Sequence, residues 1–253
     1  MELGEIIVLL DDARYARHKV KLVIVGVPRG VREYFSRTQN RTTVTNRISE
    51  VPEVASLSEQ QVDRLIRTGF VAELGYECTE PTMVSIVQFA NFITSGVPQM
   101  VHEFCLELAY LGEEAGRRLD ESQLEPAALA WLQSSLTSSY TAVESMMNER
   151  NTVAGRRNQV LYALGQVAKD EFGYADIEDI VRQEFPDSTA DKTLNISGLL
   201  SELADRQDSL IKRSPKASSY VFVDPKYRMC LRIMLRNVEE RVGKLEIRKL
   251  PKA

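Results

Sequence analysis

Two adjacent carboxylates, Asp11 and Asp12, are the first residues in the chain whose type and position suit catalysis. They follow the apolar run 6–10, and acids at the end of a buried strand can hold magnesium and orient water beside a phosphate. The same run has the spacing of an amphipathic helix, with apolar positions at Leu3, Ile6, Ile7, Leu10 and Ala13. A parallel crossover needs about a dozen residues. The next strand begins at Lys21, so we favour a helix that leaves both acids in solvent.

Nucleotide phosphates are commonly held by a glycine-rich loop, and this sequence lacks one. The pattern G-x-x-x-x-G-K-[ST] does not occur, and Gly243-Lys244 is followed by leucine without the earlier glycine. The chain alone is therefore expected to hold no cofactor and to hydrolyse no ATP. Its histidines, His18 and His102, have no metal partner at helical spacing and fit no Ser-His-Asp arrangement. No metal site is predicted.

Composition narrows the class of protein. The 253 residues are 43% hydrophobic with a net charge of -4, which is typical of a globular protein and argues against one coated in nucleic acid. Apolar runs fall short of the ~20 residues of a membrane span, and the first residues do not resemble a signal peptide. We therefore expect a cytoplasmic protein with no membrane partner. Cys78, Cys105 and Cys230 lie far apart in apolar stretches and are expected to be buried free thiols.

Polar and basic side chains in the C-terminal third are the best candidates for binding. Four stand where a recognition helix would begin, the end that enters a major groove: Lys192, Thr193, Asn195 and Ser197. Three more suit phosphate contacts from a hairpin: Lys212, Arg213 and Lys216. Acids on or after the same helix would repel DNA: Glu202, Asp205 and Asp208. Duplex DNA and a protein partner therefore remain open alternatives.

A further basic group follows on the last predicted helix, at Lys226, Arg228, Arg232 and Arg236. Apolar residues alternate with these side chains, which favours an amphipathic helix with a charged outer face. The remaining segment, 238–253, alternates acids and bases and is expected to be a solvated helical end or frayed terminus.

The elements before this third are predicted from hydrophobic spacing and caps. A buried strand at 21–27, a short helix at 29–37 and an edge strand at 48–54 indicate part of an α/β core. Ser56 is predicted to cap the next helix, with Gln60 close to the capping-box position. Thr79 and Pro81 start a long helical stretch that is broken at 95–98, and Glu125-Pro126 starts another helix. Residues 134–141 are either helix or a domain junction.

Three short helices and a hairpin are predicted from residue 158 onward. The helices are centred on 160–167, 176–185 and 194–203, and the β-rich pieces 209–212 and 219–223 are joined by a polar connection. Three helices followed by a hairpin indicate a winged helix.

The order of these pieces resembles the second half of bacterial AAA+ ATPases of the origin-recognition-like group. The resemblance rests on Val20-Lys21-Leu22-Val23-Ile24-Val25-Gly26-Val27, on Val44-Thr45-Asn46-Arg47-Ile48, on Leu57-Ser58-Glu59-Gln60-Gln61-Val62 and on Ser95-Gly96-Val97-Pro98-Gln99-Met100-Val101-His102. Residues 158–170, Gly173-Tyr174 and Tyr220-Val221-Phe222-Val223-Asp224-Pro225 resemble the winged helix that ends many of these proteins.

The resemblance implies a mostly α fold with a partial α/β core: the remnant of an AAA+ parallel sheet (1–55), a helical lid bundle (56–140), a C-terminal winged helix (141–237) and a charged tail (238–253). It implies that Arg47 is an arginine-finger candidate, with Arg41 as a substitute. Gln99 and His102 then take the place of the lid's sensor 2 arginine. Full-length relatives would bind ATP and magnesium.

Two hypotheses follow for function. In the first, the chain is the lid and winged-helix portion of a nucleotide-driven switch, and its partners are an N-terminal ATPase half or neighbouring subunits. In the second, it is a stand-alone adaptor that binds duplex DNA or a protein through its winged helix without nucleotide. A phosphate-binding loop encoded directly upstream would favour the first.

Overall fold

Helices dominate the part of the chain that the structure describes. The structure is a computed structural model, and it describes residues 56–147, 155–214 and 218–245. The chain divides into two units, Met1–Ala55 and Ser56–Ala253, and all described residues belong to the second. The strands and helices predicted between residues 1 and 55, and the arginine-finger candidate Arg47, lie outside the described residues.

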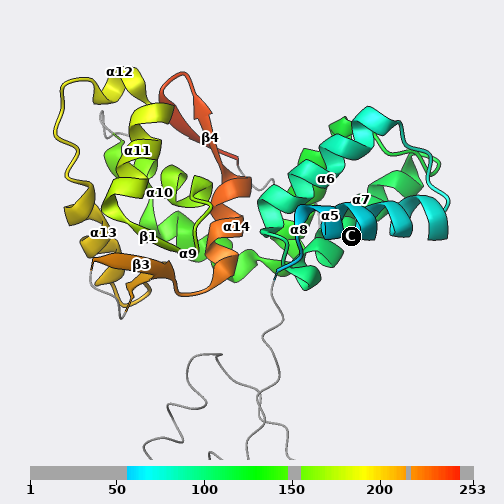
Figure 1. The fold of residues 1–253 in the computed structure, drawn as a ribbon, viewed down its shortest axis with the longest axis horizontal. Coiled ribbons are helices and arrows are strands. Elements are labelled where there is room, and N and C mark those ends of the chain that lie inside the picture. Colours follow the sequence, from blue (N-terminus) through cyan, green and yellow to red (C-terminus); the bar gives the residue numbers. More distant parts are fainter. Residues whose placement is uncertain (1–55, 148–154, 215–217, 246–253) are drawn as a thin grey trace, which may run out of the picture. The chain divides into compact units, whose positions relative to one another are not determined.

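The first described segment, 56–147, is a bundle of helices (Figure 1). Its elements are α5 (Glu59–Arg67), the π-helix η1 (Thr68–Glu73), α6 (Glu80–Thr94), α7 (Pro98–Glu114), the short η2 (Glu121–Gln123), α8 (Leu124–Ser135) and α9 (Thr137–Met146). Helix α7 packs on α6 and α8, and α5 packs on α6. The stretch 134–141 thus holds the end of α8 and the start of α9 and is helical on either side of Leu136, while the domain junction stays a prediction.

The starts of α5 and α6 follow local capping chemistry. Thr79 caps α6 as predicted, by accepting a hydrogen bond from the backbone N–H of Thr82, with Pro81 in the first turn. The cap of α5 was predicted two residues too early. Ser58, rather than Ser56, is the N-cap, because Gln61 stands three residues later and closes the capping box with it.

The core of this segment is built on large buried rings. Trp131 of α8 and Phe104 of α7 have no exposed surface, and their ring centroids are 6.3 Å apart. The indole N–H of Trp131 donates to Glu103 Oε2 at 3.0 Å, so the one polar atom of the ring is satisfied. Val101, Leu108 and Leu132 are likewise buried.

A tight backbone contact fixes the break between α6 and α7. Ser95 and Gly96 both have positive φ, at 53° and 69°, and Pro98 begins α7. The backbone N–H of Leu57 donates to the carbonyl oxygen of Gly96 at 2.7 Å. A Cβ atom on residue 96 would lie only 2.3 Å from the carbonyl oxygen of Leu57. Only glycine fits here, because both the backbone angle and the close approach exclude a side chain.

Residues 155–214 and 218–245 combine helices with small antiparallel sheets. Their elements are α10 (Arg156–Gln166), β1 (Glu171–Gly173), α11 (Tyr174–Glu184), α12 (Pro186–Thr189), α13 (Ile196–Ala204), β2 (Ile211–Arg213), β3 (Ser219–Phe222), α14 (Pro225–Met234), β4 (Leu235–Val238) and β5 (Arg241–Lys244). Strand β3 is central in the order β1-β3-β2, and both pairings are antiparallel. The described part of the chain is therefore mostly helical, as predicted, although β1 and α12 were not anticipated.

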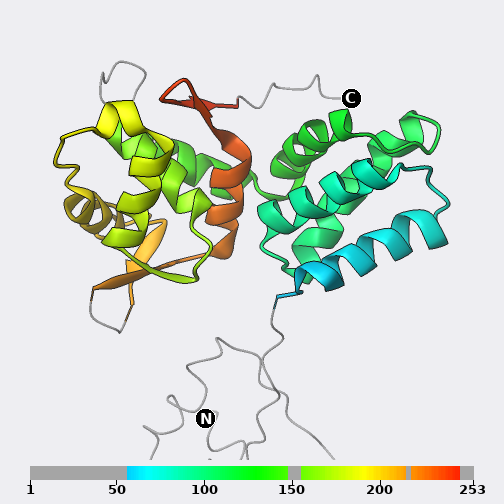
Figure 2. The ribbon, with the colours of Figure 1, turned by 45° about the horizontal axis from the view of Figure 1, so that its top comes forward.

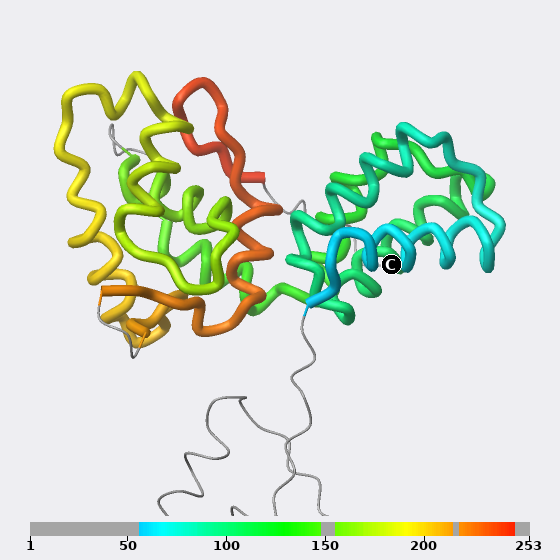
Figure 3. The backbone as a smooth tube through the Cα atoms, viewed as in Figure 1, coloured from blue at the N-terminus to red at the C-terminus, as the bar shows by residue number. Residues whose placement is uncertain are grey.

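Residues 238–245 differ from the expectation of a solvated helical end. They belong to a hairpin in which β4 pairs antiparallel with β5, Asn237 opposite Val242. Glu239 and Glu240 form its two-residue turn, both with positive φ. Such turns are normally marked by Asn-Gly or Asp-Gly, so the two glutamates gave no hairpin signal. Figure 3 shows this hairpin in red beside the yellow α12, where Glu240 Oε2 accepts from the backbone N–H of Ser188 at 3.2 Å.

Helix α14 was predicted to carry its basic residues on an outer face, and this was wrong for two of them. Arg228 and Arg232 are 7% and 6% exposed. The helix packs against α10 on one side and against α6, α8 and α9 on others (Figures 1 and 2). Because it is surrounded in this way, alternating charge does not mark a solvated face, and the guanidinium groups bond to backbone carbonyls.

Within the described residues, no helix is long and apolar enough to cross a membrane.

Candidate nucleic-acid interface

The residues predicted to begin a recognition helix lie around the start of α13. Lys192, Thr193, Asn195 and Ser197 are all exposed, whereas Leu194 and Ile196 between them are buried. Helix α13 starts at Ile196, so only Ser197 of the four lies within it. Alternating burial holds this stretch against the core and leaves its polar side chains in solvent.

Asn195 has a backbone conformation that few residue types adopt. Its φ is 52°, in the left-handed region, where asparagine is one of the better tolerated residues. Gly198, one turn on, makes room for the Asn195 side chain, since a Cβ there would lie 2.6 Å from Asn195 Oδ1. The pair Asn195 and Gly198 therefore fixes how the chain enters α13.

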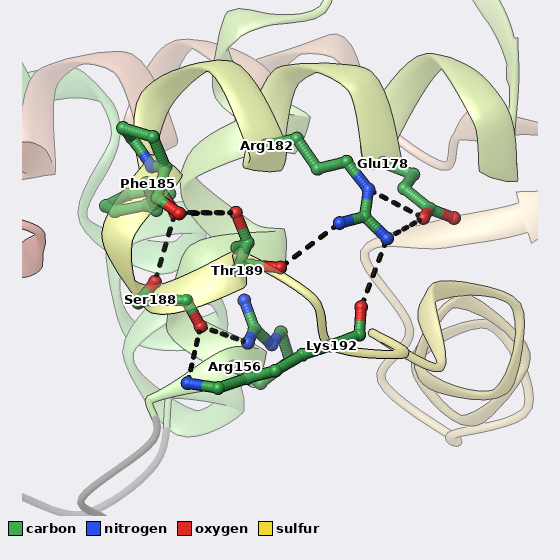
Figure 4. Close-up of polar contacts among 8 residues, drawn as sticks. Arg156, Glu178, Arg182, Phe185, Ser188, Thr189 and Lys192 are labelled. Carbon is green, nitrogen blue, oxygen red and sulfur yellow. Dashed lines mark hydrogen bonds and ion pairs between the residues drawn. The ribbon is translucent and has the colours of Figure 1, made fainter.

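Two arginines that were not predicted to be functional hold the segment before α13 in place (Figure 4). Arg182 of α11 donates to the carbonyl oxygens of Thr189 and Lys192, both at 3.2 Å, while its other contacts go to Glu178. Arg156 of α10 donates to the carbonyl oxygen of Ser188 at 3.1 Å. Carbonyl acceptors on irregular backbone need such donors when they leave water.

Arg182 and Arg156 differ in the charge of their side-chain partners. Arg182 pairs with the carboxylate of Glu178, whereas the second hydrogen bond of Arg156 goes to the neutral amide oxygen Oε1 of Gln159 at 2.6 Å. Burial, with the positive charge of Arg182 nearby, lowers the pKa of Arg156. Glu178 and Arg182 are four residues apart on a helix, a spacing from which their ion pair could have been predicted. No local pattern in the sequence predicts the contacts of Arg156.

Tyr162 anchors α10 beside the same segment. Its hydroxyl donates to Glu184 Oε2 at 3.0 Å, and its ring meets that of Phe185 edge-on with centroids 5.4 Å apart. Burial, and then the hydrogen bond to Glu184, raise the pKa of Tyr162 to about 12 from an ordinary value of 10.0.

This shift predicts how stability depends on pH through Tyr162. A phenol whose pKa is higher in the folded state stabilises the fold below its unfolded pKa and loses that contribution as pH rises through the folded value. The stability advantage of the wild type over Tyr162→Phe should therefore be constant below about pH 10 and disappear towards about pH 12. Urea unfolding of both proteins at about pH 9 and about pH 11 measures it. An equal difference at the two pH values would contradict the assignment.

The hairpin between β2 and β3 carries the second predicted basic group. Lys212 is exposed on β2. Arg213 is exposed but pairs with Asp205 at the end of α13, 3.2 Å away. Lys216 lies outside the described residues.

Two of the three acids that were expected to repel a phosphate backbone have cationic partners. Glu202 pairs with Arg157 of α10, and Asp205 pairs with Arg213. Surface pairs of this kind stabilise the fold little, yet they neutralise charge next to α13. The opposing field is therefore weaker than the bare sequence suggested.

The residues proposed for the nucleotide lie elsewhere, on α7. Gln99 is exposed and its side-chain amide donates to Glu103 Oε1 at 2.8 Å. His102 is exposed one turn away, at the rim of an apolar hollow. Gln99 therefore makes a contact within α7 and His102 borders an apolar hollow, and their role towards a nucleotide stays a prediction.

Cysteine and metal chemistry add little to this candidate site. All three cysteines are free thiols, as predicted, but the prediction that they are buried holds only for Cys230, since Cys78 and Cys105 are half-buried. Apolar surroundings raise the pKa of Cys105 and of Cys230 to about 12, which keeps both protonated and unreactive. In the described part of the chain, no group of three or more His, Cys, Asp or Glu side chains is arranged to hold a metal ion.

Comparisons with known proteins do not identify a relative. No protein-family model matches the chain. A search of curated proteins and a search of solved structures also find no match. Function therefore rests on the residues and geometry described above.

Proposed function

We propose that residues 155–245 form a winged helix that binds duplex DNA. The observation that supports this best is the order of elements: β1 separates α10 from α11, α13 leads directly into β2, and β3 pairs between β1 and β2. In a winged helix of this order, the helix that leads into the hairpin, here α13, is the recognition helix, and the β2–β3 connection is the wing.

The candidate contacts agree with this docking geometry. The start of α13 offers exposed amide and hydroxyl groups that can read base edges, and Lys192 and Lys212 can contact phosphates on either side. Residues 155–245 carry 15 Lys and Arg against 14 Asp and Glu. Binding would therefore depend on the few cations next to α13 and not on a general positive field.

A paired substitution tests this proposal. Lys192→Ala combined with Lys212→Ala should weaken binding of the full chain to a labelled duplex by roughly tenfold. The magnitude of the slope of log affinity against log salt concentration should fall by about 2, because binding displaces about one counterion from the DNA for each phosphate contact and the double variant makes two fewer contacts. Fluorescence anisotropy between about 50 and 200 mM salt measures both quantities.

The matched control removes a lysine elsewhere on the same segment. Lys226 lies in the first turn of α14, beyond the end of β3 that is farther from β2 in sequence, so Lys226→Ala should leave affinity and slope unchanged. Equal losses in the control and the double variant would mean non-specific attraction. Failure of the wild type to bind any duplex would turn the proposal towards a protein partner for α13.

A second function is favoured by the contacts of Arg232. This residue of α14 donates both to the end of α6, next to the predicted sensor 2 segment, and to the end of α10. We infer that 56–147 serves as the lid of a nucleotide-driven AAA+-type switch whose ATP-binding half is encoded upstream, with α14 passing lid motion to the winged helix. The alternative is an adaptor that works without nucleotide.

Nucleotide binding separates these two readings. The 253-residue chain alone should not bind labelled ATP, whereas a mixture with the product of an upstream gene carrying a phosphate-binding loop should. ATP binding by this chain alone would contradict the lid interpretation. An upstream region without such a loop would favour the adaptor.

A further inference from the structure

An apolar hollow opens between two walls of the helical segment 56–147. One wall is α5 with η1, and the other is α7. The hollow has a volume of about 210 Å³. Its lining includes Leu65, Phe70 and Leu74 from the first wall and His102, Leu106 and Ala109 from the second. We call it the α5–α7 groove.

The first wall has an unusual backbone. η1 is a π-helix of six residues, Thr68–Glu73, that continues α5 without a break, and the backbone N–H of Leu74 donates to the carbonyl oxygen of Gly69 at 3.0 Å. π-helical turns are rare and occur frequently at functional sites. The wider turn lets Phe70 enter the core while Leu74 stays at the edge of the groove.

Three leucines of the groove are almost half exposed. Leu65, Leu74 and Leu106 are 44%, 49% and 44% exposed. Each would gain from transfer out of water, by about 25 cal/mol for every Å² of apolar surface covered. Exposed leucines gathered around one concave site, in contrast to single scattered ones, mark an interaction surface.

The segment around the groove is strongly acidic. Residues 56–147 contain 13 Asp and Glu but only 4 Lys and Arg. Three of the four cations are already paired: Arg67 with Asp63 and Glu80, Arg117 with Glu113, and Arg118 with Glu77. The segment that contains the groove therefore carries a surplus of negative charge.

We propose that the α5–α7 groove binds an amphipathic helix of a partner protein, with leucine-like side chains on one face and lysine or arginine on the flanks. A helix laid into a hydrophobic groove is a recurring mode of recognition that needs apolar anchors at intervals of three or four residues. The exposed leucines meet the apolar face, and the excess of acids selects a basic flank. The proposal is independent of DNA or nucleotide binding.

A model peptide tests the surface even though the partner is not identified. The probe is a labelled helix of about 15 leucines and lysines with leucine at helical spacing, and its comparison is a scrambled peptide of the same composition. Fluorescence anisotropy with the full chain should show binding of the helical probe only. Glutamate in place of lysine in the probe should abolish binding, because the flanks would then be repelled.

Two matched substitutions separate the groove from general attraction. Leu106→Lys on one wall, or Leu74→Lys on the other, should weaken probe binding by about tenfold or more. Val84→Lys on α6 adds the same charge at a residue of similar exposure, 41%, outside the groove, and should leave affinity within about twofold. Circular dichroism of all three variants verifies that they are folded.

Several results would overturn the proposal. These are equal affinity of Leu106→Lys and Val84→Lys for the probe, equal binding of the scrambled or the glutamate peptide, or a concentration-dependent dimer of the wild type that Leu106→Lys dissociates. The last result would assign the groove to a second copy of the chain. Binding to anionic lipid vesicles that exceeds probe binding would assign it to a membrane surface.

Discussion

Replacing Arg232 with methionine is expected to lower the free energy of unfolding by about 3 kcal/mol, because buried oxygen atoms lose the cation that satisfies them. The guanidinium of Arg232 donates to Gly165 O at 2.6 Å, to Val167 O at 3.3 Å, to Ser95 Oγ at 3.0 Å and to the carbonyl oxygen of Phe92. It also lies over the ring of Phe92, 4.5 Å from the centroid.

The acceptors explain why a positive charge is tolerated in this interior position. They are neutral oxygens at or beside the C-terminal ends of α6 and α10, where unpaired carbonyls and the helix dipoles favour a cation. Burial, with Arg228 nearby, lowers the pKa of Arg232 to about 10. The side chain is therefore still charged at neutral pH and can satisfy both helix ends together.

Chemical unfolding in urea measures this prediction, with two comparison variants. Arg64→Met on the exposed face of α5 should change stability by less than about 0.5 kcal/mol. Arg232→Lys should give an intermediate loss, because one ammonium keeps the charge but cannot span both helix ends. A wild-type-like midpoint for Arg232→Met would show that these contacts contribute nothing net.

Gly96→Ala should destabilise the protein by about 3 kcal/mol, the second large effect expected. The new methyl group would lie 2.3 Å from the carbonyl oxygen of Leu57, and the residue would have to keep a φ of 69°. Either the α6–α7 break must move or the hydrogen bond from Leu57 N–H to Gly96 O, at 2.7 Å, must break.

Gly75→Ala is the control that isolates the steric part. Gly75 has nearly the same backbone angle, 68°, but nothing lies within 4 Å of the position that a Cβ would take. Its replacement should cost about 1 kcal/mol, from the left-handed conformation alone. Thermal or urea unfolding measures both losses, and similar values at the two positions would mean that the contact with Leu57 is not restrictive.

Much of the helical architecture was predictable from local sequence. Thr79 with Pro81, and the break at 95–98, carry their own backbone chemistry: a side-chain cap, a fixed proline φ and a glycine. Hydrophobic spacing identified the buried face of α7 and of α10, because a helix places residues three and four apart on one side. These signals act within one or two turns and do not depend on the rest of the fold.

The candidate nucleic-acid interface was predicted in part. The sequence identified the exposed residues next to α13 and the hairpin, but not how the acids there are paired. From the sequence alone Asp205 is expected to repel DNA phosphates, whereas in the structure it pairs with Arg213. Arg156 and Arg182 hold the backbone before α13 through hydrogen bonds to its carbonyl oxygens. Every residue has a carbonyl oxygen, so no residue type marks such a partner.

The sequence by itself determined the start of α6, the break between α6 and α7 and the apolar faces of α7 and α10. Only the tertiary structure decided the role of the basic residues on α14 and the use of the leucines in the α5–α7 groove. Arg232 was read as solvated because its acceptors at Gly165 and Phe92 lie 67 and 140 residues away in sequence. Local patterns record periodicity along one element, whereas burial of a charge depends on several helices that meet only when the chain is folded.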